Sequence, residues 1–114
     1  MSESQPTPIE THLLIALRGG ASYGYRLTQS VESQSGGQLT PDIGALYRTL
    51  ARLMERGWVE QVAPPEAAGA TPGRPRRYYG LTAEGERALQ IEVGRMESLV
   101  DLARSGSATP EAAS

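Results

Sequence analysis

Arginine and tyrosine residues are concentrated in one short segment of this sequence, TPGRPRRYYGLT, which spans residues 71–82. Guanidinium groups form planar, paired hydrogen bonds with phosphate oxygens, and a tyrosine hydroxyl can donate a hydrogen bond to the same oxygens. The segment therefore carries the side chains needed to hold a nucleic-acid backbone. The residues that we expect to contact such a backbone are Arg74, Arg76, Arg77 and Tyr78.

Alternation along an extended strand assigns the two tyrosines of this segment to different environments. Arg76 and Tyr78 share one face, whereas Tyr79 shares the other face with Leu81. Burial of the Leu81 face would make Tyr79 a core residue and leave at most one tyrosine for a partner. The alternative is that both tyrosines are core residues and that the arginines only keep an edge strand soluble.

A second group of candidate binding residues lies within residues 42–56, where the helical period is clearest. Apolar side chains recur on one face of this expected helix, at Ile43, Leu46, Leu50, Leu53 and Met54. The opposite face is small and basic, and such a face can enter the DNA major groove. The residues predicted to face DNA are Asp42, which is also the expected N-cap, Gly44, Ala45, Tyr47, Arg48 and Arg52. The alternative is an ordinary amphipathic helix with solvated arginines.

The charge distribution indicates a basic centre within an acidic chain. The formal net charge is −2 over 114 residues, yet residues 41–80 carry six arginines against four acidic residues. Residues 1–40 and 81–114 are net acidic, with charges of −1 and −3. All 11 basic residues are arginine, which favours paired contacts to phosphate or carboxylate.

The scaffold expected around these residues is mainly helical. Residues 7–10, Thr-Pro-Ile-Glu, predict a capping box at the start of a first helix, which Gly19 and Gly20 end. A second helix is expected over residues 23–33 with Ser22 as its cap, and Gly57 ends the third helix. Residues 58–62 and 76–81 predict two strands joined by an exposed loop, residues 63–75. This order, mainly α with a two-stranded β wing, is typical of a winged helix-turn-helix followed by one more helix.

A long last helix is expected over residues 83–104, with Thr82 as its N-cap. Its apolar residues recur at the spacing of a helix-packing seam, formed by Leu89, Val93, Met96, Val100 and Ala103 and flanked by Ile91, Leu99 and Leu102. About two heptads are too few for a free coiled coil, so we expect this helix to pair with a second copy of the chain. The alternative is a helix folded back onto its own domain. The predicted organisation is a disordered N-terminus (residues 1–6), a DNA-binding domain (7–82), a dimerisation helix (83–104) and a disordered tail (105–114).

The composition argues against an enzyme or a metalloprotein. There is no cysteine, so disulfides, thiolate ligands and thiol nucleophiles are excluded. The single histidine, His12, stands on the first helix, and no phosphate-binding glycine loop or metal-ligand spacing is present. No cofactor is therefore expected. No apolar run approaches the ~18 residues of a membrane span and no apolar leader is present, which favours a cytoplasmic protein.

Three motifs of the chain resemble the PadR family of transcriptional regulators. Residues 71–89, TPGRPRRYYGLTAEGERAL, resemble that family's wing and the start of the helix after it. Residues 13–27, LLIALRGGASYGYRL, resemble its first two helices, with Gly24 and Tyr25 matching a Gly-Tyr pair. Residues 43–60, IGALYRTLARLMERGWVE, resemble its recognition helix, with Leu46 and Tyr47 matching a Leu-Tyr pair. Together the motifs cover about residues 9–89, in the family's order.

The resemblance implies a homodimeric winged-helix repressor that binds an operator in double-stranded DNA and is usually released by a small-molecule effector. The single C-terminal helix resembles the smaller subfamily, in which that helix forms the dimer. Three positions depart from the family's pattern: Pro72 stands where glycine is common, Tyr23 where histidine is frequent, and Trp58 where an aliphatic residue is usual. The last helix contains no aromatic residue, so the sequence does not support a pocket that stacks planar drugs between paired tryptophans. A protein-interaction module without DNA binding is the other hypothesis, because six acidic residues follow residue 80.

Overall fold

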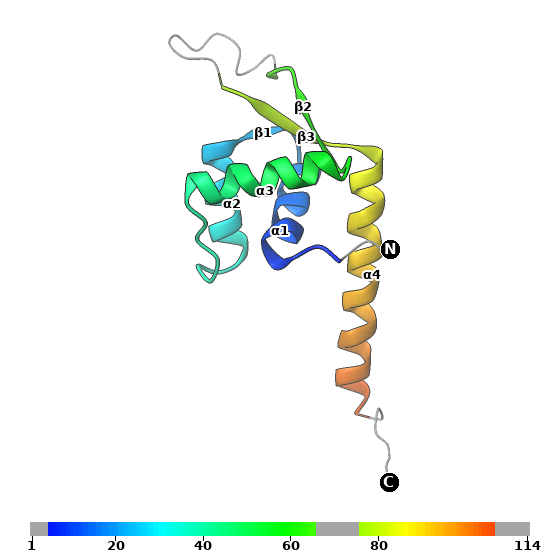
Figure 1. Ribbon diagram of the computed structural model, residues 1–114. Coiled ribbons are helices and arrows are strands. Elements are labelled where there is room, and N and C mark those ends of the chain that lie inside the picture. Colours follow the sequence, from blue (N-terminus) through cyan, green and yellow to red (C-terminus); the bar gives the residue numbers. More distant parts are fainter. Residues whose placement is uncertain (1–4, 66–75, 107–114) are drawn as a thin grey trace.

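The computed structural model describes residues 5–65 and 76–106 of the chain. Its elements follow in the order α1 (Pro8–Arg18), β1 (Ser22–Tyr23), α2 (Gly24–Gln34), α3 (Ile43–Glu55), β2 (Val59–Val62), β3 (Tyr78–Leu81) and α4 (Ala83–Ser105). Figure 1 shows α1, α2 and α3 gathered beneath a small sheet, while α4 runs along one side and away from them. This is the mainly helical winged-helix architecture that the sequence predicts.

The start of α1 has the predicted capping box. The Thr7 hydroxyl accepts a hydrogen bond from the Glu10 backbone N–H, and the Glu10 carboxylate accepts one from the Thr7 N–H. These bonds satisfy N–H groups that lack partners at a helix start, and Pro8 has no N–H to satisfy. Local sequence therefore fixes the start of α1, and it leaves the Glu10 side chain buried beside the core.

The predicted cap of α2 is wrong. Ser22 does not cap the helix, because it forms the short strand β1 with Tyr23, and Tyr23 occupies the N-cap position without a side-chain cap bond. Strand β1 pairs with β3, which places Ser22 opposite Tyr79 and Tyr23 opposite Tyr78. The sheet thus has three described strands in the order β1-β3-β2, with β3 at the centre. The sequence predicted only β2 and β3, because the two residues of β1 are too few to show an alternating pattern.

The β2–β3 hairpin is the predicted wing, with shorter strands than expected. The two strands are antiparallel, and Val59 pairs with Leu81 while Val62 pairs with Tyr78. Trp58, Arg76 and Arg77 lie just outside the strands. Residues 66–75, which include most of the predicted loop, lie outside the described residues.

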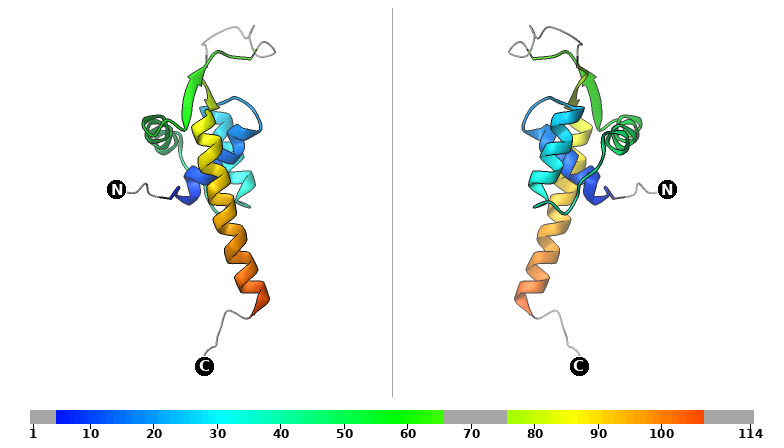
Figure 2. Two further views of the ribbon diagram at one scale, coloured as in Figure 1. Left: turned by 90° about the vertical axis from the view of Figure 1, so that its right-hand side faces the viewer. Right: turned by 90° about the vertical axis from the view of Figure 1, so that its left-hand side faces the viewer.

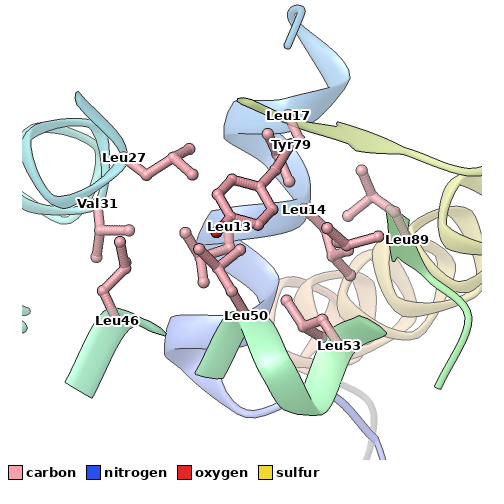
Figure 3. Close-up of a cluster of buried hydrophobic side chains, with 11 residues drawn as sticks. Leu13, Leu14, Leu17, Leu27, Val31, Leu46, Leu50, Leu53, Tyr79 and Leu89 are labelled. Carbon is pink, nitrogen blue, oxygen red and sulfur yellow. The ribbon is translucent and has the colours of Figure 1, made fainter. Parts of the chain in front are cut away.

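A leucine-rich core joins the three short helices to the sheet and to α4. Its buried members are Leu13, Leu14, Leu17, Leu27, Val31, Leu46, Leu50, Leu53, Val59, Tyr79 and Leu89. Figure 3 shows the Tyr79 ring directed from β3 into the leucine side chains of the helices. The prediction that Tyr79 is a core residue is confirmed, since it is 2% exposed.

The first half of α4 is part of this domain. The Thr82 hydroxyl caps the helix by accepting a hydrogen bond from the Gly85 N–H (2.9 Å), as predicted, and it donates one to the Gly57 carbonyl (2.6 Å). Gly85 itself permits a close approach, because a Cβ there would overlap the Trp58 carbonyl group and the Leu81 side chain. The helix start is therefore packed tightly against the wing.

The second half of α4 leaves the domain. Figure 2 shows it extending beyond the other helices in both side views. The helix ends at Ser105, one residue later than predicted, and Gly106 follows in the left-handed conformation (φ 66°) that glycine adopts without strain. Residues 107–114, most of the predicted tail, and residues 1–4 lie outside the described residues.

Candidate nucleic-acid interface

Helix α3 presents a small, exposed surface opposite its buried leucines. The Asp42 carboxylate accepts a hydrogen bond from the Ala45 N–H (2.7 Å), so the predicted N-cap is confirmed. Among the predicted DNA-facing residues of this helix, Ala45 is half-buried, and the exposed ones are Asp42, Gly44, Tyr47, Arg48 and Arg52. The predicted apolar face of α3 is not buried at its two ends, since Ile43 and Met54 are 44% and 36% exposed. Only the central turns of α3 face the core fully.

Tyr47 is held between α2 and the wing. A Cβ built on Gly24 would lie 2.5 Å from the Tyr47 hydroxyl oxygen and 2.7 Å from its Cζ, so the ring lies against the bare backbone at the start of α2. Its centroid is also 6.5 Å from that of Tyr79 on β3. The ring remains 41% exposed, which leaves its surface available to a partner. Gly24 and Tyr47, one from each of two sequence motifs, are therefore in direct contact.

The two arginines on α3 have different surroundings. Arg48 is exposed and forms no ion pair with any acid in the described part of the chain. Arg52 is also exposed, but its Nε lies 3.7 Å from the Glu10 carboxylate of α1, and its Nη2 donates a hydrogen bond to the Thr49 hydroxyl (3.3 Å). Sequence reasoning did not find the Glu10 contact, because it read Glu10 only as part of a capping box. Arg48 is therefore the cation on α3 that is available to an anion.

At the base of the wing, the arginines of the sequence motif are exposed and its tyrosines are buried. Arg76 and Arg77 are exposed, whereas Tyr78 and Tyr79 are only 6% and 2% exposed. Tyr78 is buried although it faces away from Tyr79, because the ring of Tyr23 on β1 packs edge-on against it (centroids 5.4 Å apart). This burial leaves Tyr78 little surface for the DNA contact that was predicted. Arg74, the third predicted arginine, lies outside the described residues.

The seam predicted for dimerisation on α4 begins inside the domain. Leu89 is 2% exposed within the core and Val93 packs against it, because the first half of α4 lies on α1. Leu89 therefore has almost no surface for a second copy of the chain, whereas Val93 is half-buried and its dimer contact stays a prediction. The exposed apolar side chains lie mostly further along the helix, at Ile91, Met96, Leu99, Val100 and Leu102, and Ala103 is exposed beside them.

A surface pocket of about 440 Å³ lies between Trp58 and α4. Trp58 lines it together with Ile91, and the Arg56 guanidinium stacks 4.3 Å from the centroid of the Trp58 indole. On α4, Arg95 donates hydrogen bonds to the buried Glu92 carboxylate, which raise the pKa of the Arg95 guanidinium. Arg95 is therefore charged and paired at any pH of interest.

Within residues 5–65 and 76–106, no group of three or more His, Asp or Glu side chains could hold a metal ion. No helix in these ranges is long and apolar enough to cross a membrane. His12 is half-buried, and its Nδ1 lies 3.0 Å from the Gln34 side-chain amide, so α1 and α2 share this contact.

The fold and this surface define a winged helix-turn-helix protein with an added C-terminal helix. The model of the transcriptional regulator PadR-like family matches residues 13–91, more than half of the chain. The chain therefore belongs to the PadR-like family of transcriptional regulators, a family of regulators and not of enzymes. DNA-binding regulation follows from this membership. No curated protein matches the sequence.

Solved structures of transcriptional regulators have the same fold. A PadR family regulator from Clostridium difficile R20291 is 20% identical, with a TM-score of 0.70 over 87% of this chain and 97% of that chain. A regulator from Clostridium thermocellum is 23% identical, with a TM-score of 0.66 over 89% and 90% of the two chains. A PadR family regulator from Eggerthella lenta DSM 2243 is also 23% identical, with a TM-score of 0.63 over 90% and 87%. At these identities the likeness concerns the fold.

Proposed function

We propose that this chain is a homodimeric, sequence-specific DNA-binding repressor that acts in the cytoplasm at a near-palindromic operator. The observation that carries the proposal is Arg48 on α3, which is exposed and forms no ion pair with the acids among the described residues, together with the exposed Arg76 and Arg77 at the wing base. Contact between the Tyr47 and Tyr79 rings keeps α3 beside the wing. An arginine in the major groove forms paired hydrogen bonds with guanine O6 and N7, whereas arginines beside the groove bind phosphates.

The exposed apolar side chains of α4 support the dimer. Ile91 is 71% exposed, Leu99 51% and Leu102 53%, and Ile15 on α1 is 43% exposed. Exposure of these apolar side chains to water costs free energy, and pairing with a second copy of the chain would bury them. In a two-fold dimer the two α3 helices would enter successive major grooves about 34 Å apart, which requires an operator with near-palindromic half-sites. Sedimentation velocity tests the dimer, and a purely monomeric protein at micromolar concentration would refute it.

Binding to DNA should depend steeply on salt. Each subunit offers the wing arginines, defined here as Arg74, Arg76 and Arg77, for three phosphate contacts, and the charge of Arg48 in the groove raises the number of phosphates neutralised to as many as four. A dimer then neutralises six to eight phosphates, and the plot of log affinity against log salt should have a slope of roughly −5 to −7. Fluorescence anisotropy with operator DNA between 50 and 300 mM salt measures this slope. A flat response would argue strongly against the proposal.

Gel shift with the DNA upstream of the protein's own gene separates this proposal from a protein-interaction module. Regulators of this kind commonly act on neighbouring genes, so a retarded band is expected at low salt. In vitro transcription from that DNA then tests repression, since a dimer bound over a promoter excludes RNA polymerase. Absence of any shift at low salt would favour the interaction module, whose motivation is the acidic C-terminal third of the chain.

Release by a small-molecule effector is an extension of the proposal. The pocket beside Trp58 is its physical basis, because a ligand there would contact both α4 and Arg56, the residue that follows α3. Trp58 is the only tryptophan in the chain, so its fluorescence reports directly on this pocket. Titration with small aromatic compounds, together with a thermal-shift screen that includes metal ions, tests the extension. Compounds that stabilise the protein without releasing it from DNA would contradict effector control.

A further inference from the structure

Two arginines from different elements share the ring of Tyr23. The Cζ atom of Arg76, at the base of the wing, lies 4.3 Å from the ring centroid, and that of Arg26, in the first turn of α2, lies 5.6 Å from it. Guanidinium groups at these distances are attracted to the electron-rich ring. Tyr23 itself is held in place, because it pairs with Tyr78 across β1 and β3 and packs edge-on against its ring.

This arrangement concentrates positive charge. Both Cζ atoms lie within 5.6 Å of one centroid, so the two guanidinium groups are no more than about 10 Å apart. Within about one Debye length at 0.1 M salt screening is incomplete, so the two charges act together on an anion that lies near both of them. Neither arginine forms an ion pair with an acid of the described residues. The fold thus holds two like charges close to one ring on an exposed surface, with no paired acid in the part of the chain that the structure describes.

The position of this cluster suits a DNA backbone. Gly24, the residue after Tyr23, touches Tyr47 of α3, so the cluster lies beside the recognition helix, and Arg76 joins it to the wing. Figure 1 shows the start of α2, the start of α3 and the described start of β3 on the same side of the molecule. The positive end of the α2 dipole adds to the field at this point, since the helix starts without a side-chain cap.

We propose that Tyr23, Arg26 and Arg76 form a phosphate clamp that holds one DNA backbone between the recognition helix and the wing. The inference rests on the proposed DNA binding and adds to it two residues, Tyr23 and Arg26, that the sequence did not predict to contact DNA. In this clamp the two guanidinium groups bind phosphate oxygens, the Tyr23 ring positions them, and Tyr78 supports that ring. The buried tyrosine of the wing motif therefore acts indirectly, by keeping the clamp in place.

The test is operator binding by the full-length Arg26→Ala protein, measured over a range of salt concentrations. Loss of one phosphate contact in each subunit should make the log–log slope less steep by about 2, because each contact contributes roughly 0.9. If binding at 1 M salt is unchanged, the affinity at 0.1 M salt falls about 60-fold. Base preference should stay the same, since phosphates carry no sequence information. Arg104→Ala removes the same charge from the far end of α4 and should leave the slope unchanged.

Two substitutions of Tyr23 separate the ring from its hydroxyl. Tyr23→Phe keeps the aromatic face and should bind like wild type, whereas Tyr23→Leu should weaken binding and make a further Arg26→Ala change less costly. Circular dichroism checks that each variant is folded. An unchanged slope for Arg26→Ala with tight wild-type binding would overturn the clamp and leave the proposed function intact. Absence of wild-type binding would overturn both, so the two failures are distinguishable.

Discussion

Replacement of Gly24 by alanine tests the contact between the two helices that carry the interface. A Cβ at this position would lie 2.5 Å from the Tyr47 hydroxyl oxygen. Because non-bonded heavy atoms prefer a separation of about 3.5–4.0 Å, the hydroxyl must retreat by roughly 1 Å. Overpacking of this kind costs typically about 1–3 kcal/mol, while alanine in place of glycine lowers the conformational entropy of the unfolded chain and contributes about 0.4–1 kcal/mol in the opposite direction. We expect Gly24→Ala to lower the free energy of unfolding by about 1 kcal/mol.

Gly24→Ala should instead raise the free energy of unfolding when Tyr47 is absent. In a Tyr47→Ala background the space beside Gly24 is open, so only the stabilisation of about 0.4–1 kcal/mol from the less flexible unfolded chain remains. Urea denaturation of wild type, both single variants and the double variant gives the four free energies of unfolding for this cycle. Equal effects of Gly24→Ala in the two backgrounds would refute the assigned contact, whatever their size.

Three further predictions concern the capping box of α1, the basic residues and α4. Glu10→Ala should lower the free energy of unfolding by about 1–2 kcal/mol, as thermal or chemical denaturation would show. Glu10→Gln keeps the oxygen that accepts the cap hydrogen bond and should lower it by less than half as much. Equal losses for the two variants would contradict the capping role. Alanine at all three wing arginines should weaken binding to every DNA sequence, whereas Arg48→Ala should also relax base preference, as competition assays would show; wild-type binding by the triple variant would remove the wing from the interface. Val100→Asp should dissociate the dimer in sedimentation velocity, whereas Asp101→Lys, a charge change on the polar side of the same helix, should not; a persistent dimer in both would place the interface elsewhere.

Local sequence was sufficient where a cap, a break or a helical period determined the structure. The capping box at Thr7 and the caps at Asp42 and Thr82 lie as predicted, because each depends on residues within one turn. The winged-helix order was predictable for the same reason. Strand β1 was not, because its two residues form a strand only by pairing with β3, which is more than 50 residues away in the sequence.

The candidate interface was less predictable, since periodicity shows which residues share one face of a helix or strand but not which other elements pack against that face. Alternation separated Tyr78 from Tyr79 correctly, yet it did not show that the ring of Tyr23 would bury the outer tyrosine. The seam on α4 was read as one surface, although Leu89 belongs to the core and Val100 does not. Both differences come from contacts between distant segments, which no local pattern records.

Selection of bound sequences from random duplex DNA, with wild type and Arg48→Ala compared directly, addresses the proposed function most directly. We predict that wild type enriches a near-palindromic motif with half-site centres about 10 base pairs apart. The Arg48→Ala protein should lose its preference at one position in each half-site and retain the rest. No enriched motif with wild type, or an identical motif with both proteins, would contradict base recognition by α3.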